Sequence, residues 1–167
     1  MLWVCRAGQE AAYYDEYINT SLIAIPWQGY NYDLSRFDTL SLFREVVINE
    51  KGLDNRTSVS NWASQLFAFC KQMKQGDYVL IPSFHSKTYA LSEIASDYRY
   101  QDVSSDLHHV RYVTVLYKDI PREVFSQGVQ YSLGAYRTIF KPNHADEIIA
   151  TIHDWINNTL SKGAENG

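Results

Sequence analysis

Several aromatic side chains fall at the ends of predicted elements, where a flat ligand could stack on them. Trp27 ends an apolar run at a Pro/Gly turn, and Trp62 lies beside Asn61 in the first turn of a predicted helix. Phe84 and His85 form the tip of a predicted hairpin. Aromatic faces at such open positions suit a nucleobase that has left its helical stack. The same positions also suit aromatic residues that close a hydrophobic core, and spacing alone does not decide between the two.

Residues that could perform catalysis are sparse in this chain. Ser83, His85 and Asp97 could form a triad on paper, but no G-x-S-x-G sequence surrounds any serine. Neither of the phosphate-binding sequences G-x-x-x-x-G-K-[ST] and G-x-G-x-x-G occurs. We therefore expect that this chain alone is not an enzyme, and a small hydrolase that uses Ser83 and His85 is the weaker alternative.

The histidines and cysteines do not follow a metal-binding pattern. None of the five histidines belongs to an H-E-x-x-H sequence. His108 and His109 are neighbours in a predicted strand, so their side chains point to opposite faces. Cys5 and Cys70 both lie in apolar surroundings. We expect no metal, no cofactor, and two buried free thiols in a reducing compartment, with a disulfide as the alternative.

Length and charge narrow the functional classes further. The chain has 167 residues and a net charge of −4, which suits one domain over residues 1–160 and a flexible tail over residues 161–167. The acidic balance gives no overall positive field for nucleic acid, so any basic face must be local. No apolar run approaches the roughly 18 residues of a membrane span, and the N-terminus does not resemble a signal peptide. We expect a cytoplasmic protein that does not enter a membrane.

The stretch from Ser58 to Tyr100 contains elements that are predicted to position many of these residues. Apolar residues at three- and four-residue steps predict an amphipathic helix, and Gly76 follows where a left-handed C-cap is typical. The run Tyr78–Ile81 then predicts a strand, and Thr88–Ile94 its hairpin partner. The residues between the two strands form a polar tip.

The rest of the chain alternates short strands with helices. Asp38 or Thr39 suits the N-cap of a helix within residues 33–50. The other predicted helices cover residues 9–18, 120–127 and 145–160, and the other predicted strands cover residues 2–5, 21–27, 109–117 and 138–140. This order predicts an α+β protein, in which a curved mixed sheet or partial barrel of five to six strands is flanked by helices.

The stretch from helix to hairpin resembles the EVE branch of the PUA-like superfamily, whose relatives include the YTH domains. The resembling residues are Val59–Trp62, Met73–Asp77, Tyr78–Ser83 and the pair His85-Ser86. A longer resemblance, up to about Phe140, is to the N-terminal domain of Mrr-like, modification-dependent (type IV) restriction system proteins. Its motifs occur in the same order, at Trp3–Gly8, Ile23–Trp27, Asp97–Tyr100, His109–Val113 and Ser132–Gly134.

The resemblance implies a PUA-like fold and a reader of modified double-stranded DNA that flips a base into an aromatic cage. Its partner would be an effector nuclease domain, normally fused C-terminally, in phage defence. The cage implied by position consists of Arg6, Trp27, Asn61, Trp62, Ser83, Phe84 and His85, and the implied phosphate contacts are Lys87, Arg99, Arg111 and Arg137.

The sequence departs from the related families at two prolines. Pro26 and Pro82 stand where relatives often have other residues, and both positions border the implied cage. The alternative function is a sensor or protein-interaction module that binds a small ligand or a phage protein through the same pocket. The net charge of −4 favours this alternative, whereas the aromatic residues and the order of the motifs favour the DNA reader.

Overall fold

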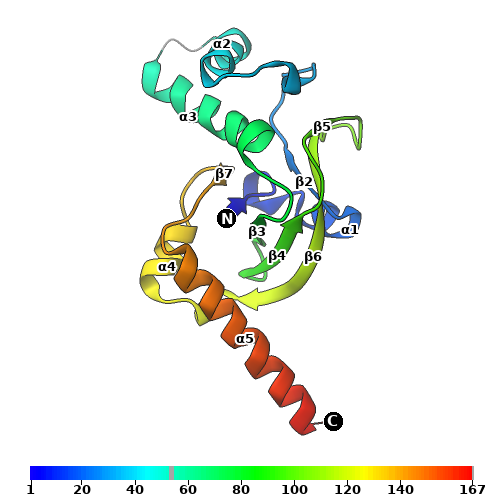
Figure 1. Cartoon of the computed structure of the whole chain (residues 1–167), viewed down its shortest axis with the longest axis vertical. Coiled ribbons are helices and arrows are strands. Elements are labelled where there is room, and N and C mark those ends of the chain that lie inside the picture. Colours follow the sequence, from blue (N-terminus) through cyan, green and yellow to red (C-terminus); the bar gives the residue numbers. More distant parts are fainter. Residues whose placement is uncertain (53–54, 167) are drawn as a thin grey trace.

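The computed structural model describes residues 1–52 and 55–166. Seven strands in these residues form one sheet with the order β2-β6-β4-β3-β1-β7, and β5 pairs with β6. The sheet curls into a partial barrel (Figure 1), which confirms the predicted α+β class with a curved sheet. The strands are β1 (Leu2–Cys5), β2 (Leu22–Ile25), β3 (Tyr78–Pro82), β4 (Thr88–Ile94), β5 (Arg99–Tyr100), β6 (His109–Pro121) and β7 (Ile139–Phe140).

The long strand β6 produces much of the curvature. Its first residues pair with β2, and its later residues pair with β4. The β4–β6 ladder has register shifts between Tyr89 and Leu91 and between Leu91 and Ser92. Such irregularities bend a strand and increase its twist. The sheet is mixed because β1 runs parallel to β3, whereas the other pairs are antiparallel.

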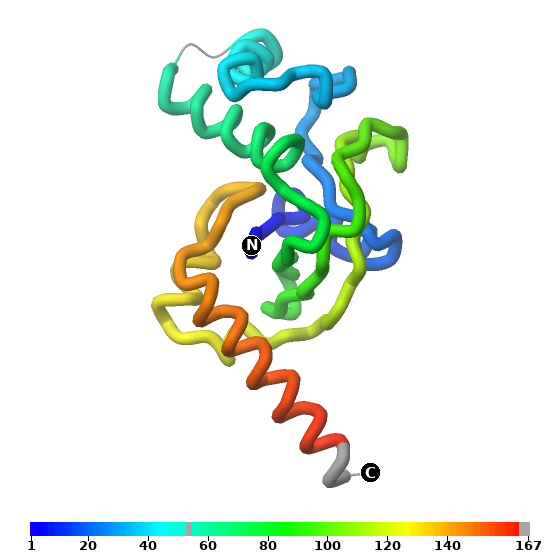
Figure 2. The backbone as a smooth tube through the Cα atoms, viewed as in Figure 1, coloured from blue at the N-terminus to red at the C-terminus, as the bar shows by residue number. Residues whose placement is uncertain are grey.

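Five α-helices flank the sheet in the described residues. Two of them, α2 and α3, pack against each other near one end of the sheet, and α5 extends away from the opposite end (Figures 1 and 2). The cap of α2 is Thr39, whose hydroxyl accepts a hydrogen bond from the Leu42 amide at 3.2 Å. The helices are α1 (Tyr14–Thr20), α2 (Leu40–Lys51), α3 (Arg56–Phe67), α4 (Gln127–Leu133) and α5 (Ala145–Asn166).

The predicted helix before β3 is present, but it ends differently. After α3 the chain makes a π-helical turn over Ala68–Gln72, and Met73 is already extended. Gly76 therefore does not cap the helix. Its φ of 92° instead serves the turn that leads into β3, where its amide donates to the Ile94 carbonyl at 2.9 Å.

Two hydrophobic clusters cover the two faces of the sheet. Strand β1 shows the division, because Trp3 and Cys5 join the larger cluster while Leu2 and Val4 join the smaller one. Residues of α1, α2 and α3 complete the larger cluster, and residues of α4 and α5 complete the smaller one. Both cysteines are free and buried, and burial raises the pKa of the Cys5 thiol to about 12.

Three further elements differ from the sequence-based prediction. The helix predicted over residues 120–127 is wrong, because Ile120 and Pro121 remain in β6 and a short 3-10 turn, Arg122–Val124, precedes α4. The two-residue strand β5 was not predicted. Helix α5 continues past residue 160 to Asn166.

Among residues 1–52 and 55–166, no helix combines the length and the apolar composition that a membrane crossing requires.

Candidate functional site

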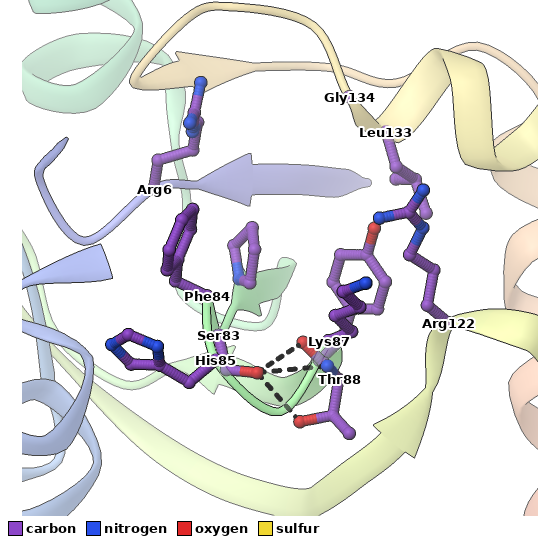
Figure 3. Close-up of a pocket in the computed structure, with 11 residues that line it drawn as sticks. Arg6, Ser83, Phe84, His85, Lys87, Thr88, Arg122, Leu133 and Gly134 are labelled. Carbon is purple, nitrogen blue, oxygen red and sulfur yellow. Dashed lines mark hydrogen bonds between the residues drawn. The ribbon is translucent and has the colours of Figure 1, made fainter. Parts of the chain in front are cut away.

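A surface cavity lies where four elements meet. It is bounded by the residue after β1, the β3–β4 hairpin, the end of β6 and the C-terminus of α4, and its volume is about 450 Å³ (Figure 3). Tyr89 and Leu133 line it and belong to the smaller hydrophobic cluster. Burial raises the pKa of Tyr89, against the opposing effect of Arg122, so its hydroxyl is protonated at neutral pH. We call this cavity the basic pocket.

Charge distinguishes the basic pocket from the chain as a whole. Its charged lining residues are Arg6, Lys87 and Arg122, and no aspartate or glutamate lines it. None of the three forms an ion pair with any residue that the structure describes. Arg122 makes one side-chain hydrogen bond, from Nε to the Gln130 side-chain oxygen at 3.3 Å. An acidic protein therefore presents a local concentration of positive charge, which attracts anions.

The β3–β4 hairpin is fixed by hydroxyl groups inside its turn. The Ser83 hydroxyl lies 2.6 Å from that of Ser86 and 2.9 Å from that of Thr88, and it accepts a hydrogen bond from the Thr88 amide at 3.0 Å. Figure 3 shows the hydrogen bonds between Ser83 and Thr88 in this network. The hydroxyl of Ser83, which the resemblance places in the cage, thus closes the turn. In the described residues no hydrogen bond joins Ser83 to His85, so the pair expected of a hydrolase is absent.

Aromatic surface lies beside the positive charge. Phe84 is 51% exposed at the hairpin tip, and its ring meets the His85 ring edge-to-face at a centroid distance of 5.2 Å. The Arg6 guanidinium lies 5.0 Å from the centroid of Tyr136, whose side chain is exposed. In Figure 3 the Phe84 side chain points toward Arg6. One end of the basic pocket therefore offers a flat apolar face next to a guanidinium group.

The two tryptophans of the expected cage lie in a neighbouring cluster and do not line the basic pocket. Their rings meet edge-to-face at 4.4 Å, which leaves no slot between them for a base. The indole N–H of Trp27 donates to the Thr138 hydroxyl at 3.2 Å, and Lys51 lies over the Trp62 ring at 4.4 Å.

The other expected cage residues lie in two places. Asn61 is exposed and accepts a hydrogen bond from Gln65 at 3.5 Å. Of the expected cage, the structure brings together Arg6, Ser83, Phe84 and His85.

The expected phosphate contacts separate into three groups. Lys87 lines the basic pocket. Arg99 and Arg137 are exposed outside it, and Arg99 lies over the Tyr112 ring.

The prediction that Arg111 contacts phosphate is wrong. Arg111 is only 3% exposed, and its guanidinium donates hydrogen bonds to the carbonyls of Phe69, Cys70 and Ser96. A side chain buried in this way does not reach a phosphate group.

Sequence reasoning missed Arg122. It follows Pro121 in a segment that was predicted to be helical, and no local signal placed it near the hairpin tip. The pairing of Thr88 with Pro121 brings it there, and the Arg122 amide donates to the Lys87 carbonyl at 3.2 Å. Only a contact between distant segments reveals this residue.

The fold and the basic pocket define an α+β protein with a curled mixed sheet and an open, positively charged binding site. The chain belongs to the family described as "Domain of unknown function (DUF8426)", which matches residues 3–140. That range includes every residue that lines the basic pocket and ends before α5. No curated protein matches the chain. Residues 1–52 and 55–166 contain no group of three or more histidine, cysteine, aspartate or glutamate residues placed to hold a metal ion.

Proposed function

We propose that this protein is a reader of modified DNA that takes a flipped base into the basic pocket and directs a defence effector, in the cytoplasm, to the modified site. One observation carries the proposal: the basic pocket combines an exposed aromatic face with three cationic side chains and no acidic lining residue, in a chain of net charge −4. Its resemblance to the EVE and Mrr-like domains supports the same reading.

The physical properties of the pocket suit a nucleotide. A volume of about 450 Å³ lies within the range of about 300–1,000 Å³ typical of small-molecule sites. Stacking of one base on an aromatic side chain contributes about 1–3 kcal/mol, and Phe84 is exposed enough to provide it. The three cations that line the same pocket favour a ligand whose flat group is joined to a phosphate. Both requirements are met by one nucleotide of a DNA strand.

Replacing Phe84 by alanine is expected to weaken binding to modified duplex by about fivefold to a hundredfold, because the stacking surface is lost. The measurement is fluorescence anisotropy with short duplexes, either unmodified or carrying methylated or hydroxymethylated bases. Tyr131→Ala is the matched control, since Tyr131 is 89% exposed but does not line the basic pocket. Modification-dependent binding that Phe84→Ala removes and Tyr131→Ala preserves supports the proposal.

A second candidate is a sensor that binds a small ligand or a phage protein through the same pocket. The net charge of −4 favours it. Tight binding to a whole duplex requires many cationic side chains that neutralise phosphates, and an acidic chain has few to spare. The anisotropy experiment separates the two. If no duplex binds at low salt, the DNA-reader function is excluded and the small-ligand function takes its place.

A further inference from the structure

We propose that Lys87 and Arg122 form a phosphate-binding subsite at one end of the basic pocket, which takes the phosphate of a nucleotide whose base lies toward Phe84. The inference rests on the proposed function only in that the ligand is a nucleotide. The phosphate can belong to a DNA strand or to a free nucleotide, since the chemistry of recognition is the same.

Backbone contacts hold the two cations together. The Arg122 amide donates to the Lys87 carbonyl at 3.2 Å, and the neighbouring residues Thr88 and Pro121 pair across the β4–β6 ladder. In Figure 3 both side chains direct their charged ends toward the same side of the cavity. Two cations that line one cavity repel each other, and no carboxylate lines the basic pocket to offset this. A bound phosphate would offset it and accept hydrogen bonds from both groups.

The backbone of Lys87 adopts an uncommon conformation in the hairpin turn. Its φ is 52°, in the left-handed region that a residue with a Cβ adopts at a cost. Glycine would adopt this conformation more readily, as Gly76 and Gly52 do in other turns of this chain. Six other described residues that carry a Cβ also have a positive φ. This conformation therefore fixes the course of the hairpin turn at Lys87, and the subsite rests on the pocket and its charge.

The opposite end of the basic pocket is lined by different kinds of side chain, so a nucleotide would bind there in one orientation. Arg6 lies against Tyr136 and beside Phe84 rather than against Lys87 (Figure 3). The subsite that we propose thus holds two cations, while the Phe84 end pairs one guanidinium with an aromatic ring. A nucleotide that enters with its phosphate toward Arg122 and its base toward Phe84 satisfies both ends.

The test is a titration of the whole chain followed by amide chemical shifts in two-dimensional NMR. The probes are inorganic phosphate, deoxycytidine, deoxycytidine 5′-monophosphate and the trinucleotide dTdCdT, at constant ionic strength. We expect saturable shifts centred on the amides of Lys87, Thr88 and Arg122 with every probe that carries phosphate, and none there with deoxycytidine. Tighter binding of dTdCdT than of the mononucleotide identifies a strand as the source, and the reverse identifies a free nucleotide.

Four variants sharpen the test. Lys87→Gln and Arg122→Gln are each expected to weaken phosphate binding about tenfold or more, because each removes a charge-assisted hydrogen bond. Arg44→Gln, which alters an exposed arginine of α2 outside the basic pocket, is expected to leave the affinity unchanged. Lys87→Gly relieves the strained backbone, so we expect an equal loss of phosphate binding without a lower Tm.

Shifts that do not saturate, or that spread over Arg99 and Arg137, overturn the subsite. So does an unchanged phosphate affinity in Lys87→Gln and Arg122→Gln. These results are distinguishable from failure of the DNA-reader function, because inorganic phosphate requires no modified base. A protein that binds phosphate at Lys87 and Arg122 but no duplex retains the subsite and loses the reader function.

Discussion

Arg111→Ala is expected to lower the free energy of unfolding by about 3–5 kcal/mol, a large share of the total for a domain of this size. Arg111 is almost completely buried, and it donates from Nε to the Phe69 carbonyl at 2.7 Å and from Nη1 to the Ser96 carbonyl at 3.1 Å. Its Nη2 donates to the Cys70 carbonyl at 3.4 Å. Two of these acceptors belong to the π-helical turn after α3, so the side chain joins that turn to β6. Alanine leaves the carbonyls unpaired and opens a cavity.

Urea denaturation followed by circular dichroism measures this loss. Arg99→Ala is the matched control, because Arg99 is exposed on the short strand β5, and we expect a change within about 0.5 kcal/mol. Arg111→Lys keeps the positive charge but lacks the planar fork of donors, so it should recover only part of the loss. A stability of Arg111→Ala close to that of the original protein would show that the buried guanidinium does not hold the turn to the sheet.

Acidification from pH 7 to pH 5 is expected to destabilise the protein through His109. The imidazole is 2% exposed, with Nδ1 2.6 Å from the Tyr98 hydroxyl and Nε2 2.8 Å from the Tyr30 carbonyl. The Leu34 amide donates to the Tyr98 hydroxyl, which leaves the hydroxyl proton for Nδ1. This assigns the proton of the ring to Nε2, in a neutral imidazole.

The sign of the pH effect follows from the pKa of His109. Burial lowers this pKa below its ordinary value of 6.5. The hydrogen bond to the Tyr30 carbonyl opposes the shift in part, the charge of His108 adds to it, and the carboxylate of Asp33 opposes it. The unfolded chain therefore binds a proton at a higher pH than the folded protein does. The contribution of His109 to stability is complete above pH 6.5 and falls below it, by up to about 1.4 kcal/mol per pH unit until the lower folded pKa is reached.

Unfolding free energies at half-unit steps from pH 7.5 to pH 5 measure this dependence, with His109→Gln as the comparison. The variant is expected to be less stable at pH 7.5, because it loses the fitted ring, but its stability should change less between pH 6.5 and pH 5. Asp33 and Asp77 do not interfere in that window, since their pKa values are held below 3.8 and their contributions are lost only in stronger acid. Equal slopes for both proteins would mean that His109 is not the acid-sensitive group.

Local sequence patterns were sufficient for most of the sheet. All six predicted strands are present, because each is a β-rich or apolar run bounded by turn residues. The missed strand β5 has only two residues, Arg99 and Tyr100, and forms by pairing with the already predicted β6. The false helix at residues 120–127 has the same cause, since pairing with β4 extends β6 through Pro121. Both errors concern residues whose structure depends on a partner strand.

The site residues also divide into those that local sequence places and those whose position depends on contacts between distant segments. Phe84 and His85 were predicted together because a hairpin tip places neighbouring residues at one point, whereas Lys87 was implied by the resemblance; all three line the basic pocket. Arg122 could not be predicted, since its position depends on a long-range pairing. Arg111 was misplaced because alternation along a strand identifies which residues share a face, but it does not show that both faces are covered.

Helix α5 shows that the family match and the folding unit are not the same length. The match ends at residue 140, yet Ile148 and Ile152 of α5 are buried in the cluster that contains Leu2 and Val4 of β1. A protein trimmed to the matched residues would expose this apolar surface to water and become prone to self-association. Anyone who transplants the basic pocket into a chimera should therefore carry the sequence through at least Ile156, so that the first strand keeps its cover.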